Sequence, residues 1–256
     1  SAWLLSAMRM VPAGKDVRAV IYRDVLVFFR SPAEWGQLFI LAALVVIYLY
    51  NIRYMPSEIA PFRVAVTLLN FATLCFVVAS VAARFAFTSI GGEGKAFFTT
   101  KALPVSPQRY VLAKFLFTAV PLTFCAALVF FFAGRLIDIR GMPFAFFLTA
   151  SVAASLFLSA LAVYMGSRSP LFDERNPAKM LMTAEGLLYM FFSMAYAGLL
   201  VVLSARPVYS HYLGMLGGEN GPRVWLTATG RVILATLPAV LVFNLAVRRV
   251  ASTQQK

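Results

Sequence analysis

The sequence predicts an all-α, polytopic membrane protein in which six transmembrane helices are preceded by an amphipathic interfacial helix. The 256-residue chain is 61% hydrophobic and 13% charged, whereas a soluble domain of this size carries about a quarter charged residues. Uncharged runs of roughly 20 residues recur along the chain. A helix of this length crosses a hydrocarbon core about 30 Å thick. The basic residues fall mainly in alternate connecting segments, as membrane topology requires.

The uncharged runs set the expected boundaries. We expect spans at residues 35–52, 64–84, 108–134, 143–166, 182–204 and 225–247, the last interrupted by Arg231. They belong to a transmembrane domain of residues 34–250, between a cytoplasmic N-terminal segment (1–33) and a cytoplasmic tail (251–256). The chain begins with Ser1, which suggests processing or a longer parent chain.

The segment before the first span has helical periodicity. In "KDVRAVIYRDVLVFFRSP", one helical face carries Val17, Ile21, Val25 and Phe28. This spacing predicts a helix that lies flat at the cytoplasmic interface, with its apolar face in the acyl boundary. The alternative is a solvated lead-in to the first span.

The net charge of +13 is divided between the two sides of the predicted bundle. With the N-terminus in the cytoplasm, the inside segments hold most basic residues: Arg9, Lys15, Arg18, Arg23, Arg30, Arg84, Lys95, Lys101, Arg109, Lys114, Arg168, Arg175, Lys179, Arg248, Arg249 and Lys256. The outside segments hold Arg53, Arg63, Arg135, Arg140, Arg206, Arg223 and Arg231. The positive-inside rule therefore places both termini in the cytoplasm, and a nucleic-acid surface is disfavoured.

The stretch "SIGGEGKAFFTTKALPVSPQ" contains a Gly-Lys pair but is not a Walker A loop. Such a loop needs a glycine five residues before the pair and a Ser or Thr after the lysine. Those positions hold Ser89 and Ala96. The preceding segment also reads as a helix rather than the required strand. We therefore expect no nucleotide site in this loop.

The same loop, residues 89–107, predicts a short helix. Its glycines interrupt the second span, and Pro104 ends the short helix before Ser106 and Pro107 start the third span. The short helix exposes Phe97 and Phe98, which suggests docking to a partner. Insertion of these phenylalanines into the lipid interface is an equally open alternative.

Few groups inside the spans could carry chemistry. Glu185, at the entrance to span five, is a functional candidate because burial of a carboxylate in a membrane is costly. Its place in a first helical turn also allows a purely structural role. Cys75 and Cys125 lie mid-span, and His211 lies alone in an outside loop, so we expect neither a disulfide nor a metal site.

Taken in order, these motifs resemble the permease component of ABC-2-type transporters, in particular bacterial ABC exporter permeases. The loop after span two has the form R-F-x-F…S-x-x-G-E-G…P-x-S…K-F, which falls on Arg84, Phe85, Phe87, Ser89, Glu93, Gly94, Pro104, Ser106, Lys114 and Phe115. A later F-D-x-x-N-P pattern falls on Phe172, Asp173, Asn176 and Pro177. The resemblance covers nearly the whole chain.

The resemblance implies an exporter subunit without a catalytic site, in the bacterial inner membrane. A cytoplasmic ABC ATPase dimer would hold ATP and Mg, with no cofactor on this chain. Residues in the coupling loop would contact that ATPase: Glu93, Gly94, Lys95, Phe97, Phe98 and Lys101. Family members are often about twice this length, so a second permease half would come from a missing N-terminal half or a homodimer mate. The scarcity of charge in the spans suggests a hydrophobic or amphipathic cargo.

Two other functions remain open on the sequence. A membrane assembly subunit that transports nothing would share the six spans. An intramembrane lipid-modifying enzyme would need His, Asp, Glu or Cys groups converging at one membrane depth. Apart from Cys75 and Cys125, which we expect to be small buried apolar side chains, Glu185 is the one such candidate within the spans.

Overall fold

The computed structural model describes residues 14–52, 54, 60–91, 105–168, 177–214 and 222–254. Regular structure in these ranges is helical throughout. Within these ranges, six helical stretches are long and apolar enough to cross a membrane: Trp35–Ile52, Phe62–Ile90, Pro107–Leu136, Met142–Arg168, Ala184–Tyr212 and Arg223–Ser252. The predicted fold class is therefore confirmed.

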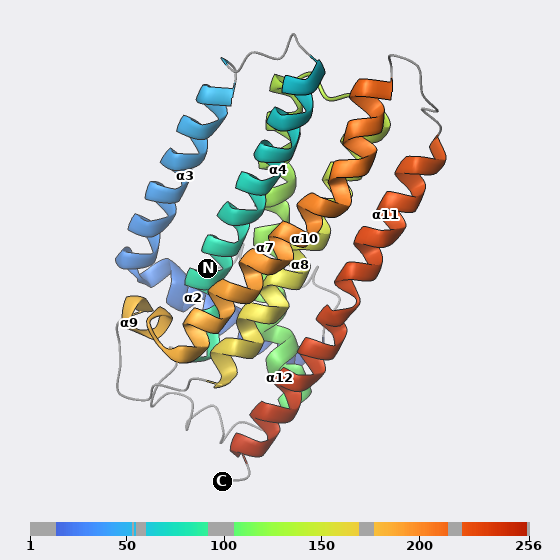
Figure 1. The fold of residues 1–256 in the computed structure, drawn as a ribbon. Coiled ribbons are helices and arrows are strands. Elements are labelled where there is room, and N and C mark those ends of the chain that lie inside the picture. Colours follow the sequence, from blue (N-terminus) through green and yellow to red (C-terminus); the bar gives the residue numbers. More distant parts are fainter. Residues whose placement is uncertain are drawn as a thin grey trace.

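Where the structure describes the connection between two consecutive helices, that connection is short (Figure 1). The N-terminal pair is α2 (Lys15–Arg30) and α3 (Pro32–Ile52). The second span is built from α4 (Ala60–Ala82), the π-helical turn η1 (Ala83–Phe87) and α5 (Thr88–Gly91). The remaining elements are α7 (Pro107–Leu136), α8 (Met142–Arg168), α9 (Pro177–Leu181), α10 (Ala184–Gly214), α11 (Pro222–Thr236) and α12 (Pro238–Gln254).

Helix α8 forms the centre of the bundle. It contacts α4, α7, α10, α11 and α12. Of the residues in its most apolar 18-residue segment, 67% are buried inside the protein. Small residues along α8, including Ala150, Ala154 and Ser155, are fully or almost fully buried. Small side chains let helix backbones approach closely in a membrane, where packing replaces the hydrophobic effect between helices. In contrast, α3 lies at the edge of the bundle (Figure 1), and 6% of its apolar segment is buried.

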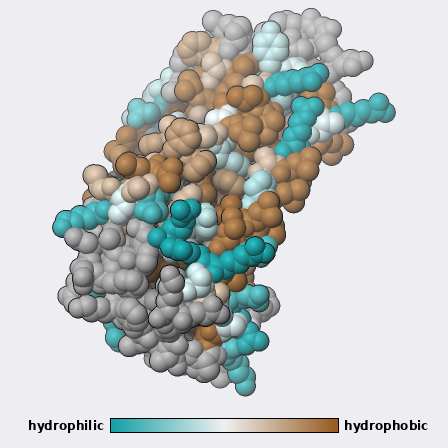
Figure 2. Space-filling model, turned by 60° about the horizontal axis from the view of Figure 1, so that its bottom comes forward, coloured by the Kyte–Doolittle hydropathy of each residue, from teal (hydrophilic) through white to brown (hydrophobic). Residues whose placement is uncertain are grey.

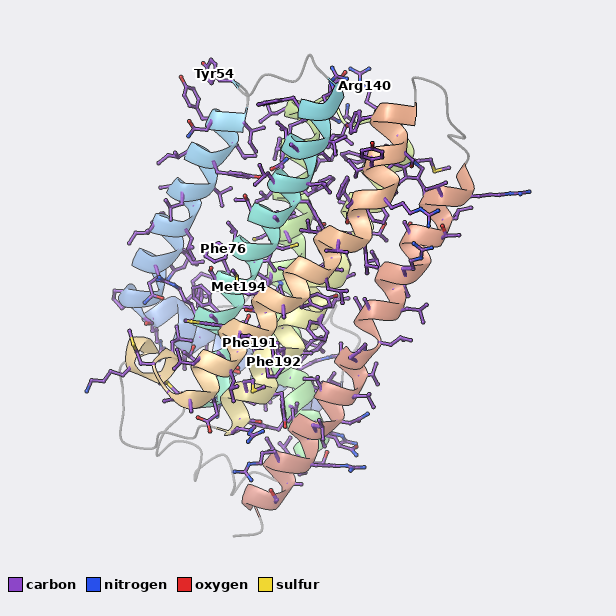
Figure 3. All side chains as sticks on the ribbon, viewed as in Figure 1. Tyr54, Phe76, Arg140, Phe191, Phe192 and Met194 are labelled. Carbon is purple, nitrogen blue, oxygen red and sulfur yellow. The ribbon has the colours of Figure 1, made fainter. Side chains whose placement is uncertain are left out.

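The outer surface of the bundle is largely apolar. Brown, hydrophobic residues dominate its length in Figure 2, and teal residues lie nearer the ends. Figure 3 labels four large apolar residues on this surface, Phe76 of α4 and Phe191, Phe192 and Met194 of α10. Such a surface is unfavourable in water and is expected where hydrocarbon chains surround the protein.

Proline sets two of the helix boundaries. Helix α7 begins at Pro107 after Ser106, where the missing N–H of proline removes no helical hydrogen bond. The last span is divided at Leu237, because Pro238 cannot donate a hydrogen bond to the preceding turn. Helix α7 continues through Pro121 without a break.

A buried tyrosine joins the second and fifth spans. The Tyr189 hydroxyl of α10 donates a hydrogen bond to the Ala79 carbonyl oxygen of α4 at 2.9 Å. The Tyr189 side chain is 1% exposed, and its ring centroid lies 6.2 Å from that of Phe87. The bond therefore gives a buried polar group a partner on a neighbouring helix.

Replacing Tyr189 with Phe is expected to lower the free energy of unfolding by about 1 kcal/mol, because one buried hydrogen bond is lost while the ring is kept. The measurement is the thermal unfolding midpoint of the detergent-purified protein. Tyr209→Phe is the matched control, because Tyr209 lies on the same helix and is 61% exposed. Equal midpoints for the two variants would contradict the role given to the Tyr189 hydroxyl.

Candidate functional site at the α2 end of the bundle

One end of the bundle collects most of the described charged residues, and we call it the α2 end. It comprises α2, η1, α5, α9, the start of α7, the start of α10 and the last turns of α8 and α12 (Figure 1). Its described basic residues are Lys15, Arg18, Arg23, Arg30, Arg84, Arg109, Lys114, Arg168, Lys179, Arg248 and Arg249. Charge of this kind stays outside the hydrocarbon core, so the α2 end lies in headgroups or water.

The amphipathic helix expected before the first span is present as α2. Part of its apolar face is covered by protein, because Val17, Val20 and Ile21 are buried and α2 contacts α7. Protein therefore replaces the acyl boundary that we expected on this part of the face. Val27 and Phe29, farther along α2, remain exposed.

A buried ion pair fixes α2 on α7. Lys114 Nζ lies 2.8 Å from Asp24 Oδ2, and the two side chains are 3% and 9% exposed. Arg23 of α2 also contacts Asp24, at 3.1 Å, and Lys114 Nζ lies 5.6 Å from the centroid of the Tyr110 ring. A buried charge without its partner is strongly destabilising, so the pair requires α2 and α7 to stay together.

The sequence holds a signal for this pair that the prediction missed. Asp24 continues the helical face of Val17, Val20 and Ile21, so a carboxylate interrupts an apolar stripe. A carboxylate in that position needs a cation from another element. The sequence does not show which basic residue supplies it, because Lys114 lies 90 positions away along the chain.

A second ion pair reinforces the contact nearer the start of α7. Arg109 of α7 donates a hydrogen bond to the Asp16 carboxylate of α2. Both side chains are solvent-accessible, so this pair contributes little stability. Its position still matters, because it joins the first turn of α7 to the first turn of α2.

The second span reaches the α2 end through the π-helical turn η1. Ala86 and Phe87 of this turn are fully buried, and η1 contacts α8. A β-carbon on Gly166 of α8 would overlap the backbone carbonyl oxygen of Phe87. The two backbones therefore touch directly. π-Helical turns inside α-helices are frequent at functional sites.

The residues predicted to contact an ATPase lie outside the described part of the chain. Glu93, Gly94, Lys95, Phe97, Phe98 and Lys101 all fall in the segment 92–104. The elements on either side of that segment are described. Helix α5 ends at Gly91 before it, and α7 begins at Pro107 after it. Both flanks belong to the α2 end, where the ion-paired α2–α7 contact and η1 position the described residues on either side of the segment.

Glu185 lies in the first turn of α10 and is partly accessible. The Thr183 hydroxyl accepts a hydrogen bond from the Gly186 N–H at 3.3 Å, which caps this helix start. A carboxylate in a first turn is favoured by the helix dipole. Among the described residues, no group of three or more His, Cys, Asp or Glu side chains could hold a metal ion.

Replacing Glu185 with Gln is expected to change the free energy of unfolding by less than about 1 kcal/mol, because the side chain keeps its shape and loses a helix-dipole interaction. The measurement is thermal unfolding in detergent, together with ATP turnover of the membrane extract described below. Complete loss of that turnover in a variant with unchanged stability would contradict a structural role and would make Glu185 functional.

These features identify the class of protein. It is a helical membrane protein with six spans, in which ion pairs between helices organise the basic end. The chain belongs to the family described as "Putative ATP-binding cassette", whose model matches residues 4–253. The comparison with curated proteins found no match, and neither did the comparison with solved structures.

The family assignment corrects three predictions made from the sequence. The resemblance to ABC-2-type permeases is wrong, because the matching family is described as an ATP-binding cassette. The exporter-permease function inferred from that resemblance is wrong for the same reason. So is the expectation of a protein without enzymatic chemistry, since an ATP-binding cassette hydrolyses ATP. The motifs that carried the resemblance are short and individually weak, and their order did not separate the two families.

Proposed function

We propose that the chain is a membrane-embedded member of an ATP-binding-cassette transport system, and that its α2 end is the end at which ATP hydrolysis acts on the membrane helices. Two observations together support the proposal. A chain whose family concerns ATP-binding cassettes is built from six helices of membrane-spanning length and composition. Such a chain can bring ATP-dependent work to a bilayer without a separate anchor.

The charge distribution supports a cytoplasmic position for the α2 end. Basic residues are enriched in segments that stay on the cytoplasmic side, and the described basic residues gather at this end. ATP is available in the cytoplasm, so the side that meets ATP and the side that carries the charge would coincide. The proposed location is the bacterial cytoplasmic membrane, with both termini inside.

The packing at the α2 end supports its role as a mechanical junction. The buried pair of Asp24 and Lys114 makes α2 and α7 move together, and η1 is in backbone contact with the central helix α8 at Gly166. A displacement of the described residues on either side of segment 92–104 would therefore be passed to α2 through α7 and to α8 through η1. Tightly packed elements pass small displacements on as whole-helix shifts.

The partner proposed for this end is a further ATP-binding cassette protein in the cytoplasm, which would share the ATP-dependent work with this chain. Its contacts would include the coupling-loop residues Glu93, Gly94, Lys95, Phe97, Phe98 and Lys101. Aromatic side chains are enriched at protein interfaces, and the two phenylalanines would supply apolar anchors there. A second membrane half, from another copy or another part of a longer chain, would complete the assembly.

The experiment is extraction of the tagged chain from its native membrane. The chain should stay in the membrane pellet after an alkaline carbonate wash, and a mild-detergent extract purified on it should hydrolyse ATP. The control is the same purification from cells that express the untagged chain. Release of the chain by carbonate, or an extract without ATP turnover above the control, would refute the proposal.

A further inference from the structure

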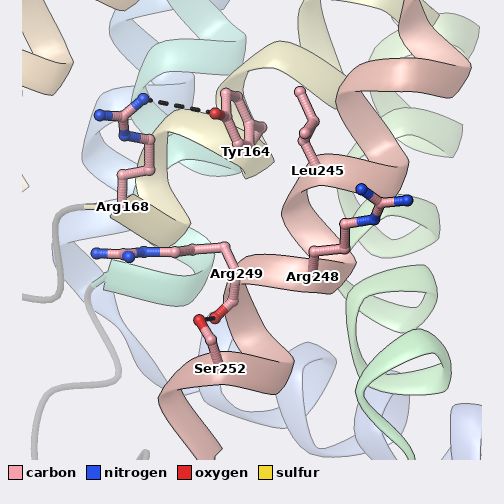
Figure 4. Close-up of a pocket in the computed structure, with 6 residues that line it drawn as sticks. All are labelled: Tyr164, Arg168, Leu245, Arg248, Arg249 and Ser252. Atoms are coloured by element: carbon pink, nitrogen blue, oxygen red, sulfur yellow. Dashed lines mark hydrogen bonds between the residues drawn. The ribbon is translucent and has the colours of Figure 1, made fainter.

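A basic hollow lies between the last turns of α8 and α12. Its volume is about 360 Å³, within the range of small-molecule sites, about 300–1,000 Å³. Figure 4 shows the six residues that line it, Tyr164 and Arg168 on α8 and Leu245, Arg248, Arg249 and Ser252 on α12. We call it the arginine hollow.

The charged side chains among the described residues that line the hollow are all arginines. Its ionisable guanidinium groups belong to Arg168, Arg248 and Arg249, and no carboxylate is among the described residues that line it. Arginine stays protonated at every physiological pH, so these three guanidinium groups stay positively charged. The planar guanidinium group offers paired N–H donors that match the oxygen atoms of a phosphate.

Aromatic contact orients one of these arginines. Arg168 donates a hydrogen bond to the Tyr164 hydroxyl at 3.5 Å, and its guanidinium carbon lies 6.0 Å from the centroid of the same ring. The two side chains come from one face of α8, four residues apart (Figure 4). This contact holds the guanidinium group at the wall of the hollow.

An apolar stripe leads from the hollow along the bundle surface. Leu241 and Leu245 of α12 are 67% and 45% exposed, and they lie four residues apart. In a helix this spacing places side chains on one face. Arg249 is the next residue at the same interval, so the stripe ends in the hollow. The stripe lies on the last membrane-length stretch, at the depth of acyl chains.

We propose that the arginine hollow binds the phosphate of an anionic phospholipid, whose acyl chain lies along the leucine stripe. Basic pockets between helices on the cytoplasmic side are suited to anionic headgroups. A free phosphate would use the guanidinium groups and leave the leucine stripe without a role. The combination of both surfaces is what selects a lipid.

The test compares the full chain with two double variants in detergent micelles doped with phosphatidylglycerol. The first is Arg168→Gln with Arg249→Gln, in the hollow. The matched control is Arg135→Gln with Arg140→Gln, which removes the same charge from exposed positions at the opposite end (Figure 3 labels Arg140). The readout is the phosphatidylglycerol retained per chain, by native mass spectrometry, with phosphatidylcholine as the neutral competitor.

The hollow variant is expected to bind phosphatidylglycerol about tenfold more weakly, because each surface arginine contributes to attraction of an anionic lipid. The control should bind as the unmodified chain does. Equal retention by both double variants would overturn the proposal. A thermal unfolding midpoint close to that of the unmodified chain shows that each variant is folded.

A separate arm uses inorganic phosphate without anionic lipid. A phosphate-induced rise in the thermal midpoint that the hollow variant loses, together with equal retention of the two lipids, would assign the hollow to a free anion. That result would also overturn the lipid proposal. Neither result bears on ATP turnover of the extract, so this site and the proposed function succeed or fail separately.

Discussion

Replacing Lys114 with Met is expected to lower the free energy of unfolding by about 3 kcal/mol. The reason is that Asp24 would keep a buried negative charge after losing its closest described partner, and removing one member of a buried pair typically costs about 3–5 kcal/mol. The lower end applies here because Arg23 also contacts the carboxylate at 3.1 Å. The measurement is the thermal and denaturant unfolding of the detergent-purified protein.

A second variant separates the charge effect from the packing effect. Asp24→Asn combined with Lys114→Met removes both charges, and this double variant should be more stable than Lys114→Met alone. Arg109→Gln is the exposed control. Its ion pair with Asp16 is solvent-accessible, so its loss should cost less than about 1 kcal/mol. A double variant as unstable as Lys114→Met would show that the ion pair does not hold α2 on α7.

Replacing Gly166 with Ala is expected to have an effect of similar size. A β-carbon there would overlap the Phe87 carbonyl oxygen and lie 2.9 Å from its carbonyl carbon. Both atoms are backbone, so α8 and η1 must separate to admit a single methyl group. Overpacking of this kind costs about 1–3 kcal/mol, and we expect the upper part of that range.

The chain offers a matched control for this substitution. Gly198 of α10 also lies inside a spanning helix, and nothing lies within 4 Å of a β-carbon built on it. Gly198→Ala should therefore be neutral or stabilise by up to about 1 kcal/mol, because alanine restricts the unfolded chain. The measurement is the thermal midpoint of both variants in one detergent. A Gly166→Ala protein as stable as Gly198→Ala would contradict direct contact between η1 and α8.

The overall architecture could be predicted because membrane insertion leaves a strong local signal. Each span needs about 20 apolar residues, and hydropathy reads this without knowledge of neighbouring helices. The helix start at Pro107 and the division at Pro238 were also predictable, since proline acts on its own helix. The amphipathic α2 followed from its periodicity alone.

The contacts that organise the α2 end could not be predicted in the same way. The pair of Asp24 and Lys114 and the contact of Gly166 with Phe87 each join residues far apart in the sequence. Periodicity and propensity describe one helix at a time, and they carry no information about which faces meet. Gly166 looked like one small residue among many in its span. The family was also misidentified, because weak motifs in the right order matched more than one group of ABC proteins.

The most direct test of the account is site-specific photo-crosslinking in the native membrane. A photoreactive residue replaces Arg30 or Arg84, both exposed at the α2 end, or Tyr54 or Arg140, exposed at the opposite end. The account predicts crosslinks to a cytoplasmic ATP-binding cassette protein, identified by mass spectrometry, from the α2 end alone. Crosslinks of that kind from the opposite end, or none from the α2 end, would contradict it.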